Sequence, residues 1–128
     1  MRASLENGKT QYKIRLSGID APERRQAFGD RSRQNLAGLV FRKYLVVEWD
    51  KVDRYKRIIG KVILDGKDVN LSQITAGYAG HYKEYQREQP FADRQSYARA
   101  EGEARTRRLG LWLDAVPVAP WDFRRNRH

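Results

Sequence analysis

The chain of 128 residues contains no cysteine, and histidine occurs only twice. The absence of cysteine excludes disulfide bonds, a thiolate nucleophile and zinc sites with Cys ligands. No segment approaches the roughly 18 consecutive apolar residues that a membrane span requires, and the first residues lack the apolar core of an export signal. We therefore expect a soluble protein with no membrane partner, in a compartment that the sequence leaves open.

Acidic residues are comparatively few. Lys and Arg total 26 against 16 Asp and Glu, which gives a net charge of +10. A positive field of this size attracts polyanions, of which nucleic acid is the commonest, although a basic domain without such a partner also fits the charge. The apolar content of 40% and the aromatic content of 11% indicate a folded chain with one core.

The spacing of apolar residues divides the chain into short strands and helices. We expect an α+β fold over residues 1–114, followed by a Pro- and Arg-rich tail at 115–128. Asp30 or Ser32 is predicted to cap the first helix, and Asp93 the last. The predicted strands lie at about 11–18, 44–49 and 57–64, and the predicted helices at about 36–43, 69–76 and 93–108.

The segment after the first alternating strand combines a guanidinium with two carboxylates. Arg15 lies on the polar face of that strand, Asp20 at its end, and Glu23 in the loop that begins at Pro22. A guanidinium binds two oxygens of an anion and never deprotonates. Carboxylates hold a hard cation or take a proton from water. Taken singly each residue has a plainer interpretation as a solvated or turn residue, but together they point to phosphodiester chemistry.

Several motifs, in the same order, resemble those of the staphylococcal nuclease (thermonuclease) family. They are RLSGIDAPE at 15–23, DRYKR at 53–57, VNL at 69–71 and AG at 76–77. The similarity runs from about Gln11 to Trp112. It implies an OB-fold, a small and mainly β barrel of five strands with about three helices. It also implies a calcium-dependent endonuclease that acts on DNA and RNA, cutting the P–O5′ bond to leave 3′-phosphates.

The resemblance also implies a role for each residue that matches a family motif. Two arginines would bind the phosphate, one carboxylate would act on the attacking water, and a second carboxylate would bind Ca²⁺ together with a backbone carbonyl. For Tyr85, packing against the core is an equally good interpretation. The implied catalytic residues are Arg15, Glu23 and Arg57, the implied metal ligands Asp20 and the carbonyl of Ala21, and the implied substrate contacts Arg54 and Tyr85.

One departure from the family pattern concerns the start of the chain. Family members carry a first barrel strand and then a Gly-Asp-Thr turn, whose Asp is another metal ligand. Counting back from Arg15, Met1 falls where the next strand begins, so the resemblance implies that both features are absent here. We expect weaker Ca²⁺ binding and low or absent activity. Uncovered strand edges are expected to lower stability or to turn a monomer into a weak strand-mediated oligomer.

Two alternatives from other functional classes stay open. The first is a non-catalytic OB module that binds nucleic acid through the same basic groove, and the second is an OB domain for protein interaction. Other residues receive structural interpretations: His81 is expected to be a structural rather than a catalytic residue, and the arginines at 124–127 to be solvated. The three tryptophans, Trp49, Trp112 and Trp121, are expected to pack in the interior.

Overall fold

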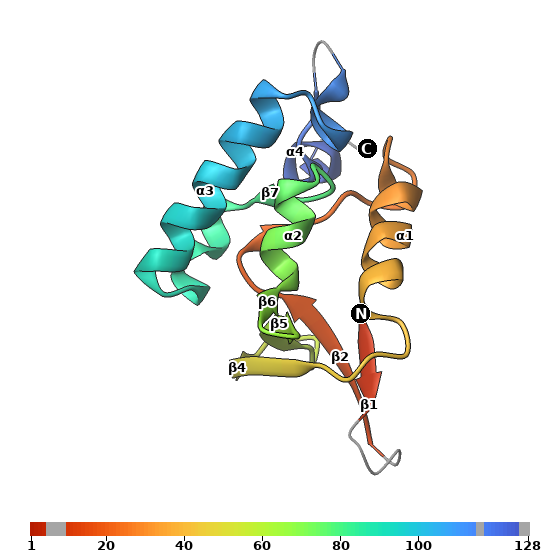
Figure 1. Cartoon of the computed structure of the whole chain (residues 1–128), viewed down its shortest axis with the longest axis vertical. Helices are drawn as coiled ribbons and strands as arrows, with labels where there is room; N and C mark the ends of the chain where they lie inside the picture. The colour runs from red at the N-terminus through yellow and green to blue at the C-terminus, as the bar shows by residue number, and fades with distance from the viewer. Residues whose placement is uncertain (5–9, 115–116, 126–128) are drawn as a thin grey trace.

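The computed structural model describes residues 1–4, 10–114 and 117–125. Its centre is a curled mixed sheet, from which the helices extend to one side (Figure 1). The parallel pair of this sheet is formed by β2 and β5, and its other pairs are antiparallel. A second, two-stranded sheet joins β3 to β7. The strands are β1 (Arg2–Ser4), β2 (Gln11–Leu16), β3 (Ile19–Asp20), β4 (Val46–Val52), β5 (Ile58–Leu64), β6 (Lys67–Asp68) and β7 (Gly80–His81), and the larger sheet has the order β1-β2-β5-β4, with β6 on β5.

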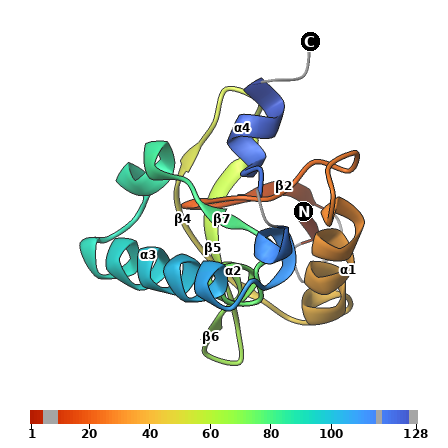
Figure 2. The ribbon, with the colours of Figure 1, turned by 90° about the horizontal axis from the view of Figure 1, so that it is seen from above.

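Helix α2 lies between α1 and α3, as two views of the ribbon show (Figures 1 and 2). The short α4 follows at the end of the described chain. The expected α+β fold with a small curled sheet is therefore confirmed, as are the three longer helices. The helices are α1 (Gly29–Val40), α2 (Val69–Thr75), α3 (Phe91–Thr106) and α4 (Pro120–Arg125), with 3₁₀ helices at η1 (Lys83–Glu88) and η2 (Gly110–Leu113).

The main core lies between the sheet and the helices. Alternate residues of a strand face opposite sides, so Ile14 and Leu16 of β2 enter the core and Arg15 points away from it. A second apolar cluster, around the buried Trp112, joins α3 to the C-terminal part of the chain. The buried residues of the main core are Ile14, Leu16, Ile19, Val62, Val69, Ile74, Ala79 and Tyr97.

A buried asparagine of α2 connects the two parallel strands. The Asn70 side chain is fully buried, and its amide nitrogen donates to the carbonyl oxygens of Ser17 and Gly60, both at 3.1 Å. Its side-chain oxygen accepts the backbone N–H of Val62 at 3.2 Å. Asn70 therefore fixes the end of β2 against β5, and this is the part of the sheet from which the polar residues described below project.

The predicted helix caps are wrong. The residue before α1 is Phe28, with a left-handed φ of 67°, and no side chain caps this end. Ser32 lies one turn further in, where its hydroxyl donates to the carbonyl oxygen of Tyr78 at 2.7 Å. Helix α3 begins after Pro90, and Asp93 in its first turn accepts a hydrogen bond from Lys61 at 3.1 Å. The side chains of Ser32 and Asp93 therefore contact other segments of the chain and do not cap a helix.

Strand β4 is an exposed edge of the sheet. Its residues Val46, Trp49 and Val52 are 62%, 56% and 51% exposed, so the expectation that Trp49 packs in the interior is wrong. In the part of the chain that the structure describes, no strand joins β4 to β1, and the sheet remains open. Asn7 and Gly8, a pair that typically forms a tight turn, lie outside the described residues. No helix within the described ranges has the length and apolar character needed to cross a membrane.

Candidate functional site

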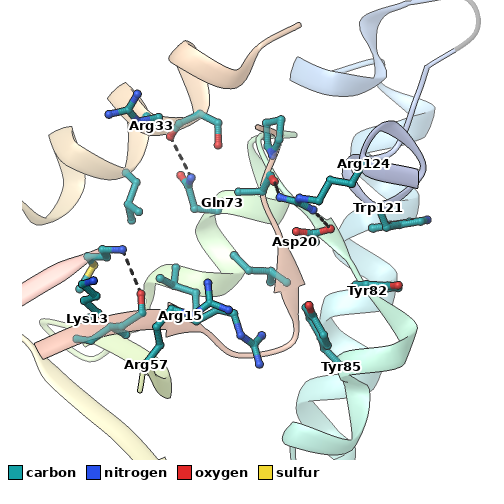
Figure 3. Close-up of a pocket in the computed structure, with 18 of the residues that line it drawn as sticks. Lys13, Arg15, Asp20, Arg33, Arg57, Gln73, Tyr82, Tyr85, Trp121 and Arg124 are labelled. Carbon is teal, nitrogen blue, oxygen red and sulfur yellow. Dashed lines mark hydrogen bonds and ion pairs between the residues drawn. The ribbon is translucent and has the colours of Figure 1, made fainter. Parts of the chain in front are cut away.

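A pocket of about 1020 Å³ lies at the junction of β2, the loop after β3, η1 and α4. Figure 3 shows basic and aromatic side chains around it, with Asp20 on one side. This composition suits a ligand that carries negative charge and planar rings. The basic side chains of the pocket can bind the charge, and its aromatic side chains can stack on the rings. The polar and aromatic residues of the lining include Arg2, Lys13, Arg15, Asp20, Arg33, Arg57, Tyr82, Tyr85, Trp121, Arg124 and Arg125.

The parallel pairing of β2 with β5 brings two of the expected residues together. Arg15 lies opposite Ile59 in the register of this pair, and Arg57 immediately precedes β5. Their Nε atoms lie 3.9 Å and 2.8 Å from the same oxygen, Oδ2 of Asp53. The two guanidiniums therefore converge on one side of the pocket, as Figure 3 shows.

Asp53 holds the loop that leads to Arg57. Its Oδ1 atom accepts the backbone N–H groups of Tyr55 at 2.8 Å and Arg57 at 2.9 Å. Although desolvation acts in the opposite direction, these hydrogen bonds and the Arg57 guanidinium keep the pKa of Asp53 below its ordinary value. Asp53 is therefore a charged residue that holds Arg15 and Arg57 in place. Sequence reasoning missed this role, although Asp53 belongs to the DRYKR motif.

Arg15 has two further partners, both from η1. Glu88 accepts hydrogen bonds from both terminal nitrogens of the guanidinium. The guanidinium carbon also lies 4.2 Å from the centre of the Tyr85 ring, which is a cation–π contact. Glu88 accepts the backbone N–H of Gly18 at 3.2 Å as well. Sequence reasoning missed Glu88, because no local pattern connects it with a strand so far away in the chain.

On the other side of the pocket, Arg124 of α4 pairs with Asp20, which lines the pocket, and with Glu23, which is not among the lining residues. Its Nε atom donates to Glu23 at 3.1 Å and its Nη2 atom to the carbonyl oxygen of Ala21 at 2.9 Å, while Nη1 binds the Asp20 carboxylate. The expectation that Arg124 is a solvated arginine is therefore wrong. A basic C-terminal segment could have suggested an acidic partner, but nothing local identifies which one.

Two of these three oxygen groups, the Asp20 carboxylate and the Ala21 carbonyl, are those expected to bind a metal ion, and the third, Glu23, is the one expected to act on the attacking water. Burial raises the pKa of Asp20, and the hydrogen bond and charge of Arg124 act in the opposite direction. Within the described ranges, no group of three or more His, Cys, Asp and Glu side chains is arranged around a metal position. Oxygen donors nevertheless suit a hard cation such as Ca²⁺. The oxygens of Asp20, Ala21 and Glu23 converge on the positively charged guanidinium of Arg124. This group of oxygen donors can therefore surround one cation.

The remaining expected residues lie in different surroundings. Arg54 is exposed in the loop between β4 and β5, with its guanidinium carbon 5.0 Å from the centre of the Tyr55 ring, and it is not among the residues that line the pocket. Tyr85 faces the pocket beneath Arg15. His81 is buried, with its Nε2 atom 3.0 Å from the Gln89 side-chain oxygen. The structural interpretation of His81 is confirmed.

Comparison with known proteins connects this chain with a protein family. The family model described as "Staphylococcal nuclease homologue" matches residues 13–114. A micrococcal nuclease of Shigella flexneri is 43% identical over 94% of this chain and 72% of its own length. Protein ParB of Escherichia coli is 40% identical over 91% of the chain and 69% of its own length. An uncharacterized endonuclease of Haemophilus influenzae is 36% identical over 94% and 65%. The chain therefore spans about two thirds of the length of these relatives.

Proposed function

Because this chain belongs to the staphylococcal nuclease family, we propose that it is a metal-dependent endonuclease that hydrolyses phosphodiester bonds of DNA and RNA. The observation that carries the proposal is the convergence of Arg15 and Arg57 on one pocket that Asp20 also lines, with Glu23 joined to it through Arg124. Relatives named nuclease or endonuclease, and a net charge of +10, support the choice of nucleic acid as substrate.

In this mechanism the two arginines bind the scissile phosphate. Their planar guanidiniums approach from neighbouring strands and can each donate two hydrogen bonds to the phosphoryl oxygens. Negative charge grows on these oxygens as water attacks, and fixed donors stabilise it. Glu88 and Asp53 hold the arginines in place before the substrate enters. Phosphate oxygens then replace part of the carboxylate contacts.

Glu23 is proposed as the group that positions the attacking water and accepts its proton. Asp20 and the Ala21 carbonyl would hold the metal ion, which we propose to be Ca²⁺ from the oxygen donors. A bound Ca²⁺ would supply positive charge beside the phosphate. By family resemblance, cleavage occurs at the P–O5′ bond and leaves 3′-phosphates. Tyr85 would stack on a base and Arg54 would contact the backbone of the substrate further from the cut.

The test is cleavage of supercoiled plasmid by the purified chain with CaCl₂, with a chelator, and after Glu23→Ser. In line with the low activity expected above, we expect slow nicking with Ca²⁺ and none with chelator. The variant should be at least 100-fold slower still, since one catalytic group typically contributes about 10²–10⁴. P–O5′ cleavage leaves 5′-hydroxyl ends, which a polynucleotide kinase labels without prior phosphatase treatment. Labelling only after phosphatase treatment would contradict the proposed bond.

One result would favour the alternative of a non-catalytic binding module. This result is retention of DNA on a filter or in a gel shift, with chelator present, together with no cleavage at any Ca²⁺ concentration. The pairing of Asp20, Ala21 and Glu23 with Arg124 would explain such an outcome.

A further inference from the structure

Arg124 uses three nitrogen atoms to bind three oxygen groups from one short loop. Nε, Nη1 and Nη2 contact Glu23, Asp20 and Ala21 respectively, and the Asp20 side chain is only 11% exposed. A solvated surface arginine samples many rotamers, whereas a guanidinium with three simultaneous hydrogen bonds has one position. The contact is therefore a specific ionic interaction between two segments that are far apart in the sequence (Figure 3).

Helix α4 presents this arginine because apolar contacts dock it on the body of the protein. The Trp121 ring stacks on Tyr82, with 4.9 Å between ring centres and 14° between planes. Trp121 also packs closely against Gly80, where a methyl group would lie within 2.6 Å of the indole. Pro120 is buried. Just before the helix, the Gln26 amide donates to the carbonyl oxygen of Val118 at 2.8 Å.

From these contacts we propose that α4 is an intramolecular inhibitor of cation binding, in which the Arg124 guanidinium occupies the place of a divalent cation. The inference rests on the metal site proposed above. A Ca²⁺ ion held by Asp20 and the Ala21 carbonyl would lie about 2.3–2.6 Å from those oxygens, which Arg124 now contacts. A guanidinium cannot keep its hydrogen bonds to those oxygens at the same time, because the two cations would share one position and repel each other. Metal binding therefore requires Arg124 to leave, and docking of α4 opposes metal binding.

The coupling has a quantitative consequence. If the oxygens accept a cation only when Arg124 is displaced, the apparent affinity for Ca²⁺ is the intrinsic affinity multiplied by the small fraction of molecules with α4 released. By reciprocity, a saturating concentration of Ca²⁺ increases that fraction. A substitution that removes the guanidinium or undocks the helix then raises the apparent affinity without changing any metal ligand.

The experiment is calorimetric titration of CaCl₂ into the full chain, its Arg124→Gln variant and the control Arg99→Gln. Arg99 carries the same charge at an exposed position of α3 and does not line the pocket. We expect Arg124→Gln to bind Ca²⁺ at least 10-fold more tightly than the wild type, and Arg99→Gln to match the wild type within 2-fold. Trp121→Ala undocks α4 and keeps Arg124, so it is also expected to bind more tightly. Circular dichroism checks that each variant is folded.

A second readout follows α4 itself by amide hydrogen exchange of the peptide that covers residues 117–125. Saturating Ca²⁺ is expected to speed its exchange in the wild type, whereas peptides from α2 stay unchanged. Equal Ca²⁺ affinities of wild type and Arg124→Gln, or binding with α4 fully protected, would overturn the competition and leave the metal site in place. Absence of Ca²⁺ binding in all three proteins would overturn the metal site and this inference together.

Discussion

The guanidiniums of Arg15 and Arg57 reach the same carboxylate oxygen, Oδ2 of Asp53, from two neighbouring parallel strands. A single acidic side chain therefore sets the distance between two cations that would otherwise repel each other. Glu88 binds the Arg15 guanidinium as well, and Arg124 binds Asp20 and Glu23. Under the proposed function, a phosphate that binds both arginines would replace some of these internal contacts.

Replacing Arg15 or Arg57 by lysine tests whether the planar guanidinium, and not only the positive charge, is needed. Arg57→Lys keeps the charge but loses the two parallel donors. Because removing one charge-stabilising donor costs about 10²–10³ in rate, we expect plasmid cleavage with Ca²⁺ to slow by about 100-fold, with little change in KM. Arg99→Lys, at an exposed position of α3, is the matched control. A rate close to that of the wild type in a folded Arg57→Lys protein would exclude Arg57 from transition-state binding.

Asp53 makes stability depend on pH in the acid range. Its folded pKa lies below the ordinary value of 3.8, so its stabilising contribution is present above that value and is lost as the pH falls through the folded pKa. We expect Asp53→Asn to lower the free energy of unfolding by a constant amount above about pH 5, and the difference from the wild type to shrink below pH 3.8. Urea denaturation at several pH values measures this. Asp50→Asn, at an exposed position, should show no such convergence.

Asn70→Ala is expected to destabilise the fold by about 2–3 kcal/mol, because the buried amide of Val62 and the carbonyls of Ser17 and Gly60 lose their partner. Urea denaturation compares the variant with Gln95→Ala at an exposed helical position. A loss below 0.5 kcal/mol would mean that water replaces these hydrogen bonds, since exposed substitutions usually stay within about that range.

Two glycines are expected to respond to alanine in opposite directions. Gly77 has a φ of +82°, and an added methyl group would lie 2.3 Å from the carbonyl oxygen of Leu109, so Gly77→Ala should destabilise by at least about 1 kcal/mol. At Gly102, on exposed helix α3, nothing lies within 4 Å of the added group. Gly102→Ala should stabilise by about 0.5–1 kcal/mol, because alanine loses less backbone entropy in a helix. Thermal unfolding of both variants measures the two signs.

The open edge at β4 predicts concentration-dependent self-association, because unpaired strand edges with apolar side chains pair with other strands. Light scattering should show a mass that rises above that of the monomer at high protein concentration. Val52→Lys on β4 is expected to return the mass to the monomer value, whereas Phe91→Lys on α3, where a similarly exposed apolar residue lies outside any strand, should not. A folded wild-type monomer at millimolar concentration would contradict the prediction.

The sequence predicted those features that depend on local patterns. Alternation in β2 correctly placed Arg15 on the polar face of the strand, opposite the core residues Ile14 and Leu16. The helix before Gly77 and the buried Trp112 also follow from local spacing and apolar character. These are consequences of backbone geometry and burial, which neighbouring residues largely determine.

Contacts between distant segments were beyond such reasoning. Glu88 on Arg15 and Arg124 on Asp20 join parts of the chain that come together only in the folded protein. The caps at Asp30 or Ser32 failed for a related reason, since Ser32 satisfies a carbonyl of another segment. Trp49 was misplaced because hydrophobic character alone does not say whether a strand is covered on both faces.

The parallel pairing of β2 with β5 also determines when the two guanidiniums can come together during folding. Parallel strands need a long crossover, here one that includes α1 and β4, and closing such a loop is slow compared with forming a hairpin. A nascent chain that ends before β5 does not yet bring Arg15 and Arg57 together. Under the proposed function, phosphate binding is therefore restricted to molecules in which β5 has joined the sheet.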